Sequence, residues 1–181
     1  EDFNSLGYNL SYQLYHAEKW DELHECISTL GYMSRQFSTN NIHEFILYWR
    51  TLKQADASKY KISQAYIEQI MGSMAEMAEM AVMLQWAYWQ MFRNDVIRLT
   101  NICISYLNDL DAAYELVEFL IRMCDQMADG DTSEERCSFH NLAGMICIRK
   151  KEYIQALKEY REGLSLAVHA YGEDDLKITS Y

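Results

Sequence analysis

The two residues best suited to hold a metal ion are Cys137 and His140, which lie three positions apart, about one turn of an α-helix. Cysteine and histidine are common ligands of structural zinc, but such a site takes four ligands. No second pair lies close in the sequence, and Cys124 could join only if the fold brought it near. We therefore expect no metal site, and a cysteine and a histidine at an interface between helices instead.

Nucleophilic catalysis would need a base beside a thiol, and His24 with Cys26 comes nearest to such a pair. Residues two apart on a helix point in different directions, and no neighbouring side chain would orient the histidine. The acidic run 129–135 lacks the ligand spacing of a calcium loop and suits a loop followed by a helix start. Because no base, nucleophile and orienting group converge, we expect neither catalytic residues nor a cofactor.

The elements that position these residues are predicted to be helices throughout. The 181-residue chain has no proline, where average usage of about 5% would give roughly nine. It has only seven glycines and is rich in Leu, Met, Ala, Glu, Gln and Tyr, which favours an all-α fold. Hydrophobic residues make up 50% of the chain, which is enough for a continuous core.

The formal net charge is −11, and the basic residues form no cluster. This pattern argues against nucleic acid and against anionic membranes as partners, because both are bound through Lys and Arg. A basic partner is compatible with it, but a solvated acidic surface is the simpler interpretation of the charge. The five cysteines are widely spaced and odd in number, which favours reduced thiols and a cytoplasmic, intracellular protein.

A helix-hairpin pattern near the end of the chain is echoed upstream. Four positions recur 43 residues later with small or apolar side chains: Leu110, Ala113, Val117 and Leu120, then Tyr153, Ala156, Tyr160 and Gly163. The connector 128–130 recurs at 170–172. Such self-similarity is typical of a stacked helical array, a fold that usually binds other proteins. Within the second copy, Gly144 and Ala156 are expected on facing sides of two paired helices.

Apolar residues at helical spacing predict about nine helices. We expect them at 3–17, 20–30, 42–52, 58–71, 74–92, 96–106, 110–127, 134–150 and 153–170. Gly72 and Ser73, and the polar run 93–95, are interpreted as breaks between helices. From residue 58 onwards the helices group into about three antiparallel hairpins, which would stack as an α-α superhelix.

The spacing of Gly144, Tyr153, Ala156, Tyr160 and Gly163 resembles a tetratricopeptide repeat, and the period is similar to the 42-residue variant of kinesin light chains and nephrocystin-like proteins. The resemblance implies repeat hairpins over residues 58–181, the last one followed by a truncated repeat. The proline expected near each repeat end is absent.

The segment 12–23 (YQLYHAEKWDEL) resembles the helix pair that follows the nucleotide-binding and winged-helix parts of STAND-type ATPases. The runs 45–50 and 66–68 resemble the bridge from that pair to the repeats. The resemblance implies that residues 1–57 are a helical linker. It also implies an ATPase module in a longer parent protein. This sequence does not contain that module, because it has no glycine-lysine phosphate loop.

In repeats of this kind the first helix of each hairpin lines the concave face, where partners bind. The resemblance places six candidate partner-binding residues on that face: Arg98, Ile102, Tyr106, Asn141, Met145 and Arg149, with Ser105 and Ile148 beside them. Arginine and asparagine there could hold the backbone or the carboxylates of an extended peptide. An ordinary exposed helix face would carry the same residue types.

The run 80–92 is the one conspicuous apolar block of the sequence, with thirteen uncharged residues. It is shorter than the roughly 20 residues that a membrane-spanning helix needs, so no membrane insertion is expected. Its helix is either buried on nearly all sides or partly exposed as an adaptable, Met-rich docking surface.

Together these patterns predict a non-catalytic interaction or scaffold module of a larger intracellular protein, which binds a protein partner or a peptide segment. The alternative is an internal coupling segment of a nucleotide-dependent STAND switch, with no ligand of its own. Partners that residues 1–181 retain without the rest of the protein would favour the first.

Overall fold

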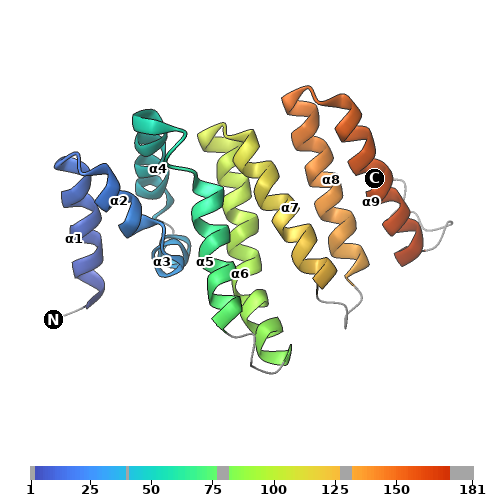
Figure 1. Ribbon diagram of the computed structural model, residues 1–181, viewed down its shortest axis with the longest axis horizontal. Coiled ribbons are helices and arrows are strands. Elements are labelled where there is room, and N and C mark those ends of the chain that lie inside the picture. Colours follow the sequence, from blue (N-terminus) through green and yellow to red (C-terminus); the bar gives the residue numbers. More distant parts are fainter. Residues whose placement is uncertain (1–2, 40, 77–81, 127–131, 172–181) are drawn as a thin grey trace. The chain divides into compact units, whose positions relative to one another are not determined.

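The computed structural model describes residues 3–39, 41–76, 82–126 and 132–171. Nine α-helices and one π-helix occur in these residues and no strand does, which confirms the predicted all-α fold (Figure 1). The elements are α1 Phe3–His16, α2 Trp20–Ile27, α3 Leu30–Ser38, α4 Ile42–Asp56, α5 Ile62–Glu76, α6 Val82–Ile102, η1 Cys103–Leu107, α7 Leu110–Gln126, α8 Ser133–Lys150 and α9 Tyr153–Tyr171.

The chain divides into two compact units, residues 1–88 and 89–181. The boundary predicted from the sequence, between residues 57 and 58, falls in the loop between α4 and α5.

The core of the first unit is built from aromatic rings of α4 and α5. Phe45, Trp49 and Tyr66 are at most 1% exposed, and their ring centroids lie 5.9–6.4 Å apart. The Tyr66 hydroxyl donates a hydrogen bond to the carbonyl oxygen of Ile27, at 2.6 Å, which ties α5 to the end of α2. Rings of this size bury large apolar areas, so this cluster contributes strongly to the hydrophobic core of the first unit.

Two helix boundaries of the first unit differ from the prediction. The helix expected at 20–30 ends at Ile27, and α3, which was not predicted, begins at Leu30. Thr29 between them is extended (ψ 142°), and its Oγ1 accepts a hydrogen bond from the Tyr32 N–H, at 3.2 Å. Thr29 is thus the N-cap of α3. The predicted break at Gly72 and Ser73 is wrong, since α5 continues through both residues to Glu76. A single glycine costs a helix only about 1 kcal/mol, which packing can offset.

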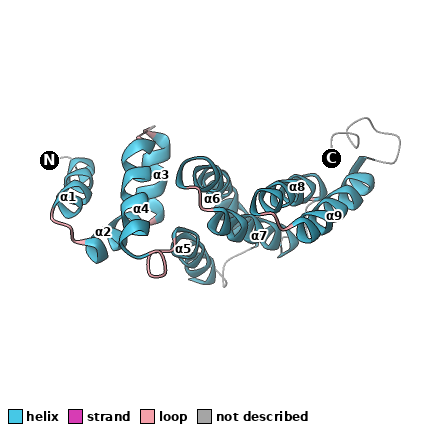
Figure 2. Cartoon of the chain, turned by 90° about the horizontal axis from the view of Figure 1, so that it is seen from above, coloured by secondary structure: helices cyan, strands magenta, loops and turns pink. Residues whose placement is uncertain are grey.

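In the second unit, α6 and α8 are parallel neighbours at an offset close to the predicted repeat period. Arg93 of α6 pairs with Glu135 of α8, 42 residues further on. Arg149 Nη2 of α8 donates to the carbonyl oxygen of Ile104 in η1, 45 residues away, at 3.3 Å. Two contacts with nearly equal offsets require helices that run in the same direction. Figure 2 shows these two helices on one side of the unit, and α7 and α9 on the other.

The same relation holds between α7 and α9. The Tyr114 hydroxyl donates to Glu159 Oε1, 45 residues away, at 2.9 Å, and Gln155 Nε2 donates to the Tyr114 oxygen, 41 residues away, at 3.0 Å. The contacts within this unit therefore repeat at separations that bracket the offset of 42 to 43 residues read from the sequence.

The contact between α8 and α9 depends on small residues, as predicted. A Cβ atom at Gly144 would stand 2.8 Å from the ring of Tyr160, and one at Gly163 would stand 3.4 Å from the Cys137 carbonyl oxygen. Ala156 is 3% exposed. The contact with Tyr160 confirms that Gly144 lies where the paired helices meet, and Ala156 is buried, as that arrangement predicts.

The second unit corrects the prediction at residues 93–95, because α6 runs through them without a break. Arg93 is accommodated by its ion pair with Glu135. The helix widens into η1 and ends at Asn108, which adopts a left-handed conformation (φ 48°, ψ 43°) that asparagine tolerates better than most residues. Part of the predicted helix 74–92 lies outside the described residues; α5 ends at Glu76 and α6 begins at Val82.

All five cysteines lie in the described residues, and none is in a disulfide. Cys103, Cys124, Cys137 and Cys147 are at most 2% exposed, and burial raises the pKa of Cys124 to about 11. We expect the folded protein to react slowly with a thiol reagent near neutral pH, with the partly exposed Cys26 modified first, because the thiolate is the reactive form. Mass spectrometry against labelling time measures this. A native disulfide would contradict it.

Candidate functional site

The residues predicted to bind a partner come from two neighbouring stretches of the second unit, α6 with η1, and α8. The exposed positions of α6 and η1 recur every three or four residues, at Met91, Asn94, Arg98, Asn101 and Ser105. Those of α8 recur in the same way, at Ser138, Met145 and Ile148 with Arg149, and Asn141 is half-exposed among them. Each set therefore lies along one side of its helix.

Large apolar side chains are exposed on these two stretches, as they also are on α9. The exposed fractions are 61% for Met91, 57% for Tyr106, 51% for Met145 and 47% for Ile148. Exposed apolar groups that gather on one part of a surface are typical of binding sites. Met91 was not among the predicted residues, although its spacing of seven from Arg98 is the signal that places it on the same side of α6.

Two arginines accompany these apolar groups. The Arg98 side chain is 60% exposed, and its nearest carboxylate oxygen, on Asp95, is 4.0 Å away. Arg149 donates one hydrogen bond to the Ile104 carbonyl oxygen, two residues before Tyr106, and a guanidinium has five N–H donors. Both arginines can therefore still bind a carboxylate from outside.

Ile102 differs from its prediction, since it is only 4% exposed. The outward positions of α6 advance by steps of three and four residues, and the step after Arg98 leads to the exposed Asn101. Ile102 is one residue further round the helix and faces the interior. We define the α6–α8 face as Met91, Arg98, Tyr106, Asn141, Met145, Ile148 and Arg149.

The apolar run 80–92 is amphipathic over residues 87–92, the part whose side chains the structure describes. Trp89 is completely buried and Phe92 is 8% exposed, whereas Met91 between them is 61% exposed. Residues 80 and 81 lie outside the described residues. Among the helices that the structure describes, none combines the length and the apolar character needed to cross a membrane.

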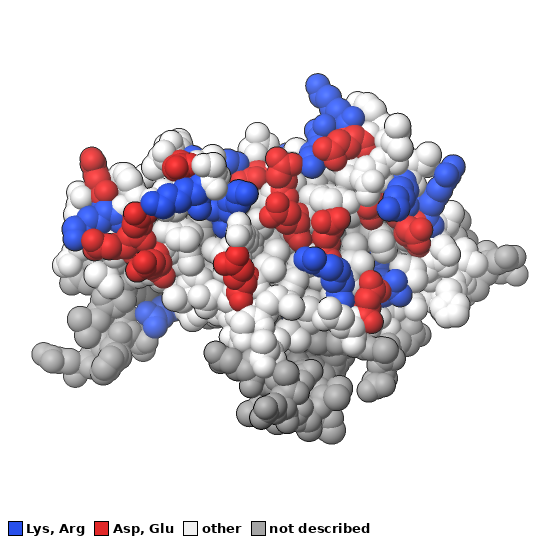
Figure 3. Space-filling view, viewed as in Figure 1, with Lys and Arg blue, Asp and Glu red and all other residues white. Residues whose placement is uncertain are grey.

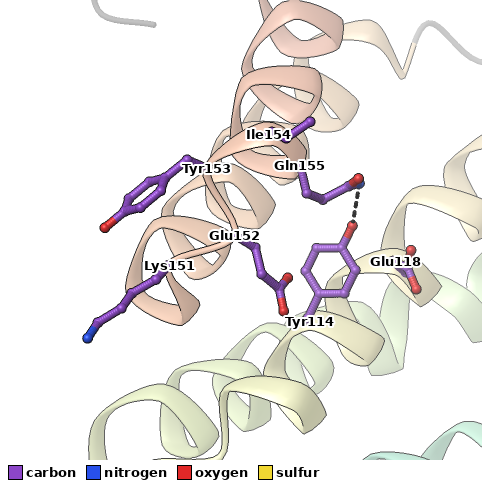
Figure 4. Close-up of a pocket in the computed structure, with 7 residues that line it drawn as sticks. All are labelled: Tyr114, Glu118, Lys151, Glu152, Tyr153, Ile154 and Gln155. Atoms are coloured by element: carbon purple, nitrogen blue, oxygen red, sulfur yellow. Dashed lines mark hydrogen bonds between the residues drawn. The ribbon is translucent and has the colours of Figure 1, made fainter.

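An open hollow of about 730 Å³ lies between α7 and the start of α9 (Figure 4). Its lining residues are Tyr114, Glu118, Lys151, Glu152, Tyr153, Ile154 and Gln155. In Figure 4 the side chains of Gln155 and Glu152 turn toward Tyr114, while those of Lys151 and Tyr153 point away from it.

The polar atoms beside this hollow are already paired with one another. Glu159, 7% exposed, accepts hydrogen bonds from the Tyr114 hydroxyl (2.9 Å) and from Gln155 Nε2 (2.6 Å), and its other oxygen lies 2.9 Å from His140 Nδ1. Burial and the Glu159 carboxylate raise the pKa of Tyr114, which keeps its hydroxyl a donor. This network joins α7, α8 and α9, so its evident role is to hold the three helices in register.

Lys150 contacts the Tyr114 ring and two carboxylates near it. Its Nζ lies 2.8 Å from Asp111 Oδ1 and 3.0 Å from Glu152 Oε1, and 5.3 Å from the centre of the Tyr114 ring. The hydrogen bond to Asp111 is the main cause of its raised pKa. Acidic and basic side chains are likewise interspersed on the face that Figure 3 shows.

The cysteines and histidines considered for metal binding or nucleophilic chemistry are packed against, or bonded to, neighbouring side chains of the fold. Cys137 is buried, and His140 contacts Glu159 rather than a second cysteine. In residues 3–39, 41–76, 82–126 and 132–171, no group of three or more His, Cys, Asp or Glu side chains is arranged to hold a metal ion. His24 packs against the rings of Trp49 and Tyr60, and burial lowers its pKa.

Comparison with protein-family models, with curated proteins and with solved structures gives no match. The function is therefore inferred from the arrangement of the side chains.

Proposed function

We propose that this chain is a non-catalytic interaction module that binds a segment of another protein on the α6–α8 face. The observation that carries the proposal is the gathering of four exposed, large apolar side chains with Arg98 and Arg149 on two adjoining stretches of one unit. Apolar groups supply binding free energy by leaving water, and arginines orient the partner through directed hydrogen bonds. Methionine, tyrosine and arginine are also enriched in protein interfaces.

The chemistry of the face indicates a segment that carries both carboxylates and apolar side chains. Arg98 and Arg149 place local positive charge on a chain whose net charge is −11, so carboxylates of the partner are directed to them. The unbranched side chains of Met91 and Met145 adapt to apolar side chains of different shapes.

The contacts between helices support, as part of the same proposal, a tetratricopeptide-like array. Pairs such as Arg93 with Glu135 and Tyr114 with Glu159 join residues 42 and 45 apart, as stacked hairpins of that period would. Such arrays commonly present the first helix of each hairpin to a partner, which is the position that α6 and α8 have in the second unit.

A peptide library displayed on phage tests the proposal with a defined probe. We expect the peptides selected on residues 1–181 to be rich in Asp, Glu and apolar residues. The double variant Arg98→Glu/Arg149→Glu should weaken their binding about tenfold or more, and more strongly at low salt, because like charges then replace the attraction. Its melting temperature should change little, since exposed charges contribute little to stability.

The matched control is Arg122→Glu/Arg161→Glu, which makes the same change of charge at exposed positions of α7 and α9. It should leave binding of the selected peptides nearly unchanged. Equal losses in both double variants would mean that net charge, and not the α6–α8 face, governs binding.

A further inference from the structure

Helix α9 exposes an apolar surface of its own, on the side turned away from α7. Ile154, Leu157 and Leu164 are 90%, 51% and 42% exposed. Together with the exposed Arg161 and the half-buried Val168, they recur at alternating spacings of three and four residues. We call these five residues the α9 stripe. The same spacing forms the seam along which two helices pack in a coiled coil.

The α9 stripe lies opposite the contacts that α9 makes with α7. Gln155 and Glu159 are both hydrogen-bonded to Tyr114 of α7. Leu157 and Arg161 each follow one of these two residues by two positions, which is about 200° round a helix. The stripe therefore faces away from α7, and its exposed fractions show that none of the described helices covers it.

The corresponding face of α7 shows what kind of element covers such a surface. The positions 43 residues before the stripe are Asp111, Tyr114, Glu118, Ile121 and Asp125. Tyr114 is hydrogen-bonded to α9, and the two aspartates pair with Lys150 and Arg136 of α8, at 2.8 Å each. This face of α7 is thus covered by a pair of helices. Because the contacts of this unit repeat at nearly the same offset, the stripe on α9 is suited to a helix as well.

The composition of the stripe indicates what the covering helix carries. Where α7 has two aspartates that pair with α8, the stripe has Ile154 and Val168, so apolar contact replaces ion pairs. Arg161 stands in the place of Glu118 and has no ion pair or hydrogen bond with the described residues. An arginine within an apolar contact needs a carboxylate from the other side. The stripe contains no carboxylate, so the same stripe of a second copy would not supply one.

We propose that the α9 stripe binds an amphipathic helix of a partner protein, with apolar residues at the same alternating spacing and an aspartate or glutamate opposite Arg161. The stripe spans residues 154–168, so the partner helix needs about four turns. The α9 stripe shares no residue with the α6–α8 face. The proposal therefore does not rest on the proposed function.

The probe for the test is a synthetic peptide of about three heptads, with leucine at the alternating positions and one glutamate in the centre of its apolar stripe. Fluorescence anisotropy follows its binding to residues 1–181, which we expect to be saturable. Arg161→Glu should raise the Kd about tenfold or more, because like charges then meet. A peptide with lysine in place of the glutamate should bind this variant better than the unchanged chain. Absence of saturable binding, or a loss that the lysine peptide does not reverse, would overturn the proposal.

The apolar part of the contact has its own variant and a matched control. Leu157→Ala/Leu164→Ala should raise the Kd for the probe about tenfold or more, since it removes apolar contact area. Leu10→Ala/Leu47→Ala removes leucines of similar exposure, 47% and 43%, from the first unit. Arg122→Glu, at an exposed position of α7, is the control for charge. Both controls should leave the Kd unchanged, and losses equal to those of the stripe variants would contradict the proposal.

A second copy of the chain is the alternative occupant, and sedimentation identifies it. A dimer of residues 1–181 that Leu157→Ala/Leu164→Ala converts to a monomer would mean that two copies meet at the stripe, against the proposal.

The two surfaces are distinguished by one further comparison. Arg98→Glu/Arg149→Glu should weaken the peptides selected on the α6–α8 face and spare the helical probe, whereas Arg161→Glu should do the reverse. Loss of the helical probe in Arg98→Glu/Arg149→Glu alone would place the helix on the α6–α8 face and overturn the assignment to α9.

Discussion

Replacing Gly144 with leucine is expected to destabilise the protein by about 1–3 kcal/mol, because overpacked contacts cost that much. The first atom of any side chain at this position would stand 2.8 Å from the Tyr160 ring, closer than carbon atoms approach one another. The helices α8 and α9 would have to separate, or the ring would have to leave its place. In a chain of this length the melting temperature falls by roughly 2–4 °C per kcal/mol, which circular dichroism measures.

Two further variants locate the cause of this effect. Gly72→Ala is the control, because its Cβ would have no atom within 4 Å, and we expect it to stabilise α5 by about 0.5–1 kcal/mol. Adding Tyr160→Ala to Gly144→Leu should recover part of the loss, since the two residues are coupled through one contact. An unchanged melting temperature for Gly144→Leu alone would show that α8 and α9 do not meet at this glycine.

The α8–α9 hairpin could be predicted because its signal is local. Small residues at helical spacing, as at Gly144 and Ala156, indicate where two neighbouring helices approach. The continuous course of α6 through residues 93–95 could not be predicted in this way. Within α6 the side chain of Arg93 is paired with Glu135, 42 residues away, and no local pattern reveals that partner. Without knowledge of that partner, the polar residues 93–95 resemble a turn.

The sequence predicted which helices carry the candidate site, but it did not predict every residue that faces outward. The helical period placed Arg98 and Met145 on exposed faces, but it assigned Ile102 to the same side, because a step of four residues fits an ideal helix as well as a step of three. The Glu159 network was missed, since its partner Tyr114 lies 45 residues away and the spacing carries no signal.

Trp89→Ala is expected to have the largest effect of any single change discussed, about 3–5 kcal/mol. Trp89 is completely buried, and its ring meets the edge of Phe119 with the centroids 5.9 Å apart. Alanine would leave a cavity between α6 and α7 and remove this aromatic contact. Urea unfolding with a linear extrapolation measures the loss, and it should appear as a lower midpoint with the slope preserved.

Met91→Ala, two residues further along the same helix, is the matched comparison. Because Met91 is 61% exposed, its removal should change the free energy of unfolding by less than about 0.5 kcal/mol. The same change should weaken the peptides selected on the α6–α8 face, since it removes apolar area from the proposed contact. The two variants thus divide the apolar run between core and surface: one should affect stability, the other binding. If Met91→Ala destabilised the protein as strongly as Trp89→Ala, Met91 would belong to the core, and the α6–α8 face would lose the residue that begins it.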